Sequence, residues 1–111
     1  MCQTNPKTLF HGGHYNITTC LGCRTVGLFY NNILSSFEHD QFVQFADSVS
    51  SLKFQDVCVP FPDGQARVIL KTCHRDIQFC FNYPEFVEFQ VGLSESLVLL
   101  EIQDVLNQKT T

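Results

Sequence analysis

The residues of this chain that are best suited to chemistry lie near its N-terminus. Residues 1–24 hold three cysteines and two histidines, which are Cys2, His11, His14, Cys20 and Cys23. Cys20-x-x-Cys23 places two thiols on one tight turn, where they can converge on a tetrahedral zinc ion. Zinc needs four ligands, so this pair is half of a site. The sequence therefore predicts a zinc site only if other residues join the pair.

A hairpin at the N-terminus would bring Cys2 to that pair. Gly12-Gly13 is typical of a two-residue turn between antiparallel strands. The register that this turn predicts pairs His11 with His14, Leu9 with Asn16, and Lys7 with Thr18. Continued toward the N-terminus, the register lays Cys2 beside Cys23. The two histidines lie at the end of this hairpin that is far from the cysteines, because six extended residues put His14 roughly 20 Å from Cys20.

His39 is the predicted fourth ligand. It lies in the first turn of a helix that follows Phe37, and Phe37 is expected to pair with Val26, close to Cys23. That helix then runs ~22 Å away, which places Cys58 too far from the site. We therefore predict a zinc site of Cys2, Cys20, Cys23 and His39. The other candidates for the fourth position are Cys73, His74, a water molecule and a partner subunit.

Two other interpretations of the cysteines remain open. They can be ordinary reduced thiols, and Cys58, Cys73 and Cys80 are expected to be small apolar residues rather than ligands. A redox C-x-x-C is disfavoured, because such a motif follows a strand and opens a helix, whereas this one joins two strands.

The elements that must position these residues belong to two segments of similar sequence, 44 residues apart in the chain. Aligning residues 26–49 with 70–93 gives five identities: Ile33/Ile77, Phe37/Phe81, Phe42/Phe86, Val43/Val87 and Phe45/Phe89. Each segment has the pattern strand, turn, strand, helix. The sequence thus predicts an internal duplication.

In the first segment, strands at 25–30 and 33–37 flank Asn31-Asn32, which tolerates the positive φ of a two-residue hairpin turn. This turn pairs Tyr30 with Ile33 and Val26 with Phe37. A helix is expected to begin near Ser36, a good N-cap. Its inner positions are Phe42, Phe45, Val49 and Leu52.

In the second segment, strands are expected at 67–73 and 77–81, with Cys73 opposite Ile77. The last helix, from Tyr83 to about residue 107, begins with a good N-cap at Asn82 followed by Pro84 and Glu85. Gly92 predicts a break of this helix near Ser94.

The last helix carries two apolar faces. One consists of Phe86, Phe89, Leu93, Leu97 and Leu100, and the other of Val87, Val91, Val98, Ile102 and Val105. One face can pack on its own sheet, and a second apolar face is typical of burial against another element or subunit. We therefore predict a homodimer through this helix.

Composition excludes several classes of protein. The 111 residues, 44% of them apolar, suffice for one domain with its own core. The net charge is −4 and the seven basic residues are scattered, so nucleic acid is not an expected partner. The N-terminus lacks the apolar run of a signal peptide, and no stretch approaches the ~18 apolar residues of a membrane span. A cytosolic location follows as an expectation.

The chain resembles an uncharacterised family of small bacterial proteins, mostly from Bacteroidetes. The resemblance rests on Met1-Cys2, Cys20-x-x-Cys23, the strand Val26-x-Leu28-x-Tyr30, and Phe42-x-x-Phe45 in a first helix. It implies that Cys2, Cys20 and Cys23 belong together, and it implies no activity. The chain departs from the family at Asn31-Asn32, where a glycine is expected, so the type of hairpin is not carried over.

The sequence thus predicts one α+β domain over residues 1–111. Antiparallel strands and a C-x-x-C knuckle occupy 1–24, and two hairpin-plus-helix repeats (ββα-ββα) occupy 25–54 and 67–108. The expected function is that of a structural or interaction module with a zinc site. The alternatives are a metal-free homodimeric interaction protein and an enzyme that uses an open three-cysteine zinc site or a reactive thiol. The enzyme lacks supporting motifs, since no Ser/His/Asp spacing, phosphate loop or HExxH occurs.

Overall fold

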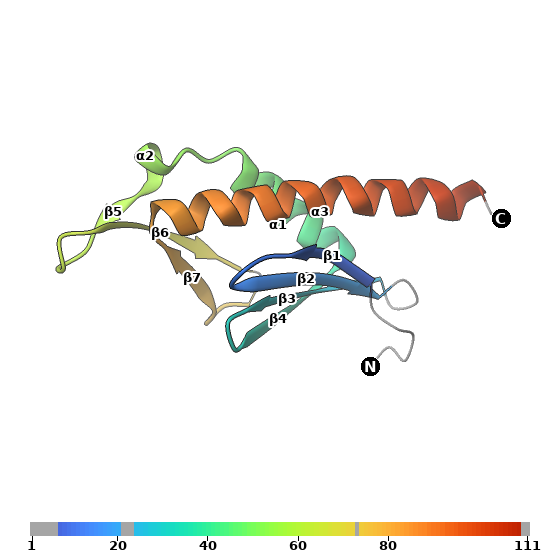
Figure 1. The fold of residues 1–111 in the computed structure, drawn as a ribbon, viewed down its shortest axis with the longest axis horizontal. Helices are drawn as coiled ribbons and strands as arrows, with labels where there is room; N and C mark the ends of the chain where they lie inside the picture. Colours follow the sequence, from blue (N-terminus) through green and yellow to red (C-terminus); the bar gives the residue numbers. More distant parts are fainter. Residues whose placement is uncertain (1–6, 21–23, 73, 110–111) are drawn as a thin grey trace.

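A computed structural model describes residues 7–20, 24–72 and 74–109 of the chain. They form an α+β fold in which two antiparallel sheets and three helices share one core (Figure 1). The first sheet has the order β1-β2-β3-β4 and the second the order β5-β6-β7. The strands of the first sheet are β1 (Lys7–His11), β2 (Tyr15–Cys20), β3 (Thr25–Tyr30) and β4 (Ile33–Glu38).

The hairpin of β3 and β4 has the predicted register. Tyr30 pairs with Ile33 and Val26 with Phe37. Asn31 has a φ of 55°, which is the left-handed conformation expected at this turn. Val26 and Phe37 are buried on the core face of the sheet. The turn residues therefore fixed this register locally.

The predicted register of the N-terminal hairpin is wrong. Lys7 pairs with Thr19 rather than Thr18, and His11 pairs with Asn16 across a loop that occupies positions 12–14. A β-bulge at Leu9 shifts the pairing by one residue between Thr8 and Phe10. The physical reason is burial. The predicted pair would put Leu9 on the same face as Asn16, whereas the bulge lets Leu9 enter the core beside its neighbours on β2.

Helix α1 (His39–Ser50) begins later than predicted. Ser36 stays in β4, opposite Gly27, and the N-cap is Glu38. The Gln41 side chain, in the first turn of the helix, accepts a hydrogen bond from the Glu38 N–H at 3.1 Å. The N–H of the N-cap residue is thereby paired. Pairing of β4 with β3 thus overrides the capping preference of Ser36, because a helix from Ser36 would remove Phe37 from its strand.

The second half of the chain contains two short elements that the sequence did not predict, α2 (Phe54–Val57) and β5 (Val59–Pro60). They lead into β6 (Ala66–Lys71) and β7 (Gln78–Phe81). The predicted register of this hairpin is off by one residue, since Val68 pairs with Phe81 and Leu70 with Phe79. All four of these side chains are buried together, and a slip of one residue would place the phenylalanines opposite exposed positions of β6. Cys73 lies outside the described residues.

Helix α3 (Tyr83–Lys109) starts where the sequence predicts. Asn82 Oδ1 accepts a hydrogen bond from the Glu85 N–H at 3.0 Å, and Glu85 Oε1 accepts one from the Asn82 N–H at 2.9 Å. The predicted break near Ser94 is absent, because α3 is one continuous helix. Gly92 is buried against Tyr15, so this glycine serves close packing rather than a break.

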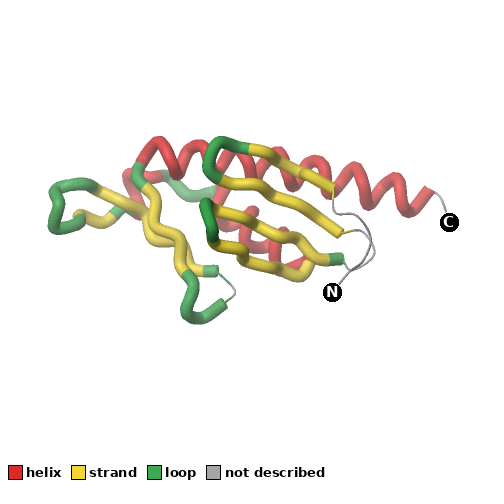
Figure 2. The backbone as a smooth tube through the Cα atoms, turned by 60° about the horizontal axis from the view of Figure 1, so that its bottom comes forward, coloured by secondary structure: helices red, strands yellow, loops and turns green. Residues whose placement is uncertain are grey.

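Helices α1 and α3 cover one face of the four-stranded sheet, and no other described element covers its opposite face (Figure 2). On the open face, Phe29 pairs with Leu34, and both are exposed. The second sheet lies beneath the first turns of α3, and the C-terminal turns of α3 extend past the four-stranded sheet (Figure 1). The molecule is elongated as a result, with extents of 54 × 25 × 25 Å. None of its helices, within the described residues, has an apolar stretch long enough to cross a membrane.

Candidate functional site

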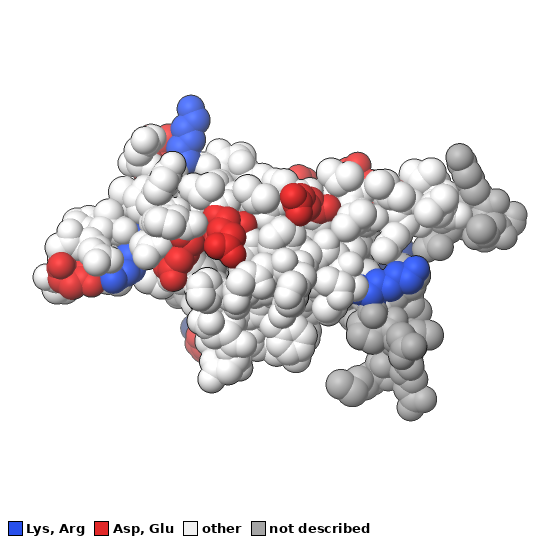
Figure 3. Space-filling view, in the orientation of Figure 1, with Lys and Arg blue, Asp and Glu red and all other residues white. Residues whose placement is uncertain are grey.

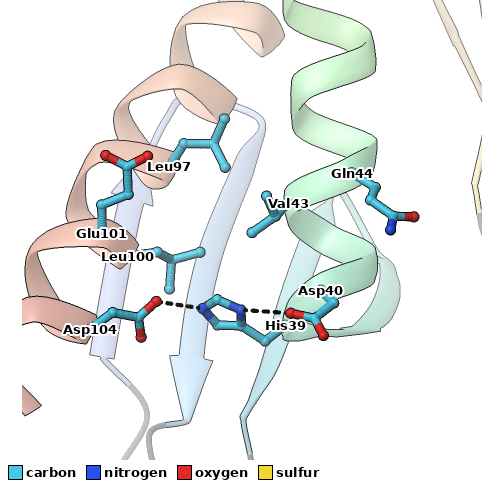
Figure 4. Close-up of a pocket in the computed structure, with 8 residues that line it drawn as sticks. All are labelled: His39, Asp40, Val43, Gln44, Leu97, Leu100, Glu101 and Asp104. Atoms are coloured by element: carbon cyan, nitrogen blue, oxygen red, sulfur yellow. Dashed lines mark ion pairs between the residues drawn. The ribbon is translucent and has the colours of Figure 1, made fainter. Parts of the chain in front are cut away.

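A cleft of about 390 Å³ separates the first turns of α1 from the C-terminal half of α3. Each helix contributes four residues: His39, Asp40, Val43 and Gln44 from α1, and Leu97, Leu100, Glu101 and Asp104 from α3. The spacing in each set is that of one helix face. Figure 4 shows Val43, Leu97 and Leu100 turned toward the space between the helices. The cleft thus has an apolar floor and, at one end, the polar side chains of His39, Asp40 and Asp104.

His39 lies at one end of the cleft, between two carboxylates. Its Nδ1 is 3.6 Å from Asp40 Oδ1 and its Nε2 is 3.5 Å from Asp104 Oδ2 (Figure 4). The His39 side chain is only 13% exposed. Both ring nitrogens are buried and make no hydrogen bond within the described protein. The imidazole is thus flanked by a carboxylate on each side, one from α1 and one from α3.

The position of His39 follows from the β3–β4 hairpin. Thr25 pairs with Glu38 at the end of the ladder, and the His39 N–H donates a 3.0 Å hydrogen bond to the Arg24 carbonyl. His39 consequently begins α1 at the end of the sheet where β2 ends and β3 begins. The sequence-based placement of His39 at this end is confirmed.

A second, smaller hollow of about 20 Å³ joins His39 to Cys20. Thr19, Cys20, Arg24, His39, Leu100, Gln103 and Asp104 line it. Cys20 is buried at the end of β2 and is bonded in a disulfide. Cys2 and Cys23, the other predicted ligands, lie outside the described residues. The zinc set of Cys2, Cys20, Cys23 and His39 therefore stays a prediction.

The other cysteines and histidines of the sequence are dispersed. His11 ends β1 and His14 lies in the β1–β2 loop, at the opposite end of β2 from Cys20. Cys58, between α2 and β5, and Cys80, on β7, are free thiols, and Cys80 pairs across the sheet with Ile69. His74 Nε2 lies 2.7 Å from the Ser36 carbonyl and so joins the β6–β7 loop to β4. Among the described residues, no group of three or more His, Cys, Asp and Glu side chains is arranged to hold a metal ion.

Sequence reasoning missed Asp104, the residue that brings α3 to His39. A signal for it was present. Asp104 continues the helix face of Leu93, Leu97 and Leu100 at the spacings of four, three and four residues. A carboxylate at the end of an apolar face predicts a polar partner at the rim of the core, although the partner itself is set by the tertiary fold.

The outer face of α3 is a second candidate surface. Val87, Val91, Val98, Ile102 and Val105 are all exposed there, as the sequence predicts, whereas Phe86, Phe89, Leu93 and Leu100 are buried. Val98, Ile102, Val105 and Leu106 line a shallow, largely apolar groove together with Glu101. Because Glu101 also lines the cleft, the groove and the cleft adjoin along α3.

On the face that Figure 3 draws, the described residues form no basic patch. In the face drawn in Figure 3, acidic side chains lie along the middle of the molecule and the basic ones are single and well separated. The cleft itself contains three carboxylates and no lysine or arginine among its lining residues. Its electrostatic character is acidic.

The chain matches no protein-family model, no curated protein and no solved structure. The resemblance to small Bacteroidetes proteins consequently stays a prediction.

Proposed function

We propose that this chain is an interaction module that acts as a homodimer, with the outer face of α3 as its contact surface. The observation that carries the proposal is the row of exposed aliphatic side chains along that face. Val98 is 56% exposed and Ile102 and Val105 are each 49% exposed. Single exposed apolar side chains are normal, but several on one helix face are typical of a protein contact.

The arrangement of the row supports a helix contact. At 100° per residue, positions 87, 91, 98, 102 and 105 fall within an arc of about 60°. The centre of this arc lies about 160° from that of the buried face, so the two faces are nearly opposite. Within the described residues, no other element covers the row. Two copies can therefore bury it against each other about a twofold axis, where the same patch serves both partners.

The oligomeric state of the wild type and of Ile102→Glu tests this proposal. We expect light scattering at tens of micromolar protein to give the mass of a dimer for the wild type. Ile102→Glu places a charge among the aliphatic side chains that the proposed dimer would bury. The substitution should weaken association at least about tenfold, which leaves monomers. Leu34→Glu is the matched control, because Leu34 is exposed to a similar degree, 51%, on the open face of the sheet.

Two results would contradict the proposal. A wild type that stays monomeric at high concentration would show that the row is not a self-contact. A dimer that survives Ile102→Glu and dissociates in Leu34→Glu would move the contact to the open face of the four-stranded sheet.

Zinc binding by Cys2, Cys20, Cys23 and His39 is a second candidate. The observation that favours it is the hollow that Cys20 and His39 line together. Zinc is bound by thiolates, so the disulfide at Cys20 has to be reduced first. A site with an open fourth position would allow a zinc-dependent enzyme, and a closed one would be structural.

Metal content of reduced, untagged protein tests this candidate. We expect one zinc per chain and a lower melting temperature after chelation, since structural zinc contributes directly to folding. Cys20→Ala should abolish binding, whereas Cys80→Ala is the control because Cys80 is exposed on β7. Absence of zinc from a zinc-supplemented preparation would end this candidate.

We also propose that the two ββα segments of the chain arose by duplication of one unit. Support comes from the common order of elements, with β3, β4 and α1 in one unit and β6, β7 and α3 in the other. The aligned residues Phe42 and Phe86 are both buried on the inner face of their helices.

A further inference from the structure

We propose that the two copies of the dimer run antiparallel through the C-terminal half of α3, with the twofold axis at Ile102. This inference rests on the proposed homodimer and adds the direction and the register of the contact. The occupant of the shallow groove on α3 is then the same groove of a second copy, whose lining residues are Val98, Glu101, Ile102, Val105 and Leu106.

The spacing of the exposed apolar side chains in residues 98–106 is the same in both directions along the helix. These side chains are between 38% and 56% exposed and belong to Val98, Leu99, Ile102, Val105 and Leu106. A twofold axis perpendicular to α3 at Ile102 sets Val98 against position 106 of the second copy and Leu99 against position 105. Ile102 meets its own counterpart. The patch is therefore self-complementary, as a twofold contact requires.

Other positions of the axis match fewer apolar side chains. An axis at Val98 sets Ile102 against Ser94, and an axis at position 100 sets Val105 against Glu95. The axis at Ile102 leaves none of the five side chains opposite a polar residue. The sequence of the exposed face thus selects one register.

The shape of the protein favours the antiparallel direction. The C-terminal turns of α3 extend past the four-stranded sheet, whereas α2 lies beside the first turn, where the Phe54 and Tyr83 rings are 5.3 Å apart (Figure 1). In this register the first turns of the two α3 helices are roughly 60 Å apart, at 1.5 Å per residue on each side of the axis. The sheets of two chains with a net charge of −4 are therefore kept apart. Val87 and Val91 stay outside the contact.

The size of the contact is that of a weak dimer. Burial of the five half-exposed side chains and of the polar side chains beside them would remove roughly 1,000 Å² in total from solvent, which is at the lower limit for a specific protein contact. We therefore expect a dissociation constant in the micromolar range.

Glu101 makes this association depend on charge. It lines the groove and is adjacent to the axis, so the antiparallel register brings the two Glu101 carboxylates of the dimer close together, where they repel. Glu101→Gln should tighten the dimer about twofold to fivefold in light scattering. Glu88→Gln is the matched control, since Glu88 is also exposed on α3 and lies 14 residues from the axis. Equal effects of the two substitutions would contradict the register.

Crosslinking of introduced cysteines tests the register directly. We expect Ile102→Cys to form a disulfide-linked dimer on mild oxidation, because the axis brings position 102 to its own copy. Val98→Cys alone should not crosslink, since its two copies would lie about 12 Å apart along the helix, beyond the reach of a disulfide. A mixture of Val98→Cys and Leu106→Cys should crosslink.

Controls separate this pairing from other disulfides. The wild type under the same oxidation reports on the free thiols of Cys58 and Cys80. Leu34→Cys reports on chance collisions, because Leu34 is 51% exposed and lies on β4, away from α3. Circular dichroism verifies that each variant is folded.

Three results would overturn the inference. Crosslinking of Val98→Cys alone, as strong as that of Ile102→Cys, would show parallel helices and leave the homodimer in place. A dimer in light scattering without a crosslink at position 102 would move the contact to another register or another surface. A wild type that stays monomeric at high concentration would remove the register together with the proposed dimer.

Discussion

At the scale of single residues, Gly92 allows Tyr15 to pass across α3. A Cβ at position 92 would lie 2.5 Å from the Tyr15 hydroxyl and 2.7 Å from its ring. Tyr15 cannot easily retreat, because its hydroxyl donates to the Glu88 carbonyl and its ring stacks on Phe10. The glycine thus joins the N-terminal hairpin to the longest helix.

We expect Gly92→Ala to destabilise the protein although alanine is the better helix former. The gain in helix propensity is about 1 kcal/mol. The overlap with Tyr15 forces side-chain and backbone shifts that cost up to about 3 kcal/mol. The net loss, about 1–2 kcal/mol in the free energy of unfolding, is measurable by denaturant titration.

Gly13→Ala is the control for this substitution. A Cβ at position 13 meets no atom within 4 Å, so its effect should remain below about 0.5 kcal/mol. An unchanged or higher stability of Gly92→Ala would show that Tyr15 moves aside at little cost.

At the scale of elements, Glu85 connects the first sheet to the start of α3. One of its carboxylate oxygens caps the helix at Asn82, and the other accepts a hydrogen bond from the Tyr30 hydroxyl at 3.2 Å. Burial of Tyr30, followed by the negative charge of Glu85, raises the pKa of Tyr30 to about 12. The last residue of β3 and the first turn of α3 are therefore coupled through one carboxylate.

The raised pKa predicts a loss of stability in alkali. In the unfolded chain, tyrosine ionises near a pKa of about 10. Between pH 10 and pH 12 the unfolded state loses its proton while folded Tyr30 retains it, so the stability contributed is full below pH 10 and is lost as pH rises through 12. Burial also raises the pKa of Tyr15, which adds to the same slope.

Unfolding free energies measured from pH 8 to pH 12 check this prediction. Tyr30→Phe should make the decline above pH 10 less steep, because one of the two raised groups is gone. The same slope in Tyr30→Phe and in the wild type would mean that Tyr30 ionises alike in both states.

At the scale of the whole molecule, Phe89 is the point where the parts of the fold meet. Its ring contacts Tyr15 of β2, Phe45 of α1, and Phe79 and Phe81 of β7, with centroid distances from 4.7 to 6.2 Å. A second connection is Gln90, whose amide donates to the carbonyls of Val49 and Leu52 at the end of α1. The two sheets thus share one core because α3 contributes to both.

The sequence by itself determined the features that depend on neighbouring residues. The β3–β4 register follows from a two-asparagine turn, and the start of α3 follows from the Asn82 and Glu85 cap. The two faces of α3 follow from helical periodicity over its length. The position of His39 at the Cys20 end of the sheet is a direct consequence of that hairpin register.

Only the tertiary structure decided the features that depend on distant residues. The bulge at Leu9 and the register of β6 with β7 are set by which side chains the common core accepts. The meeting of His39 with Asp104, 65 positions away, requires α3 to run unbroken past α1. Local propensity carries no information about such contacts, because the free energy that selects them comes from packing the assembled core.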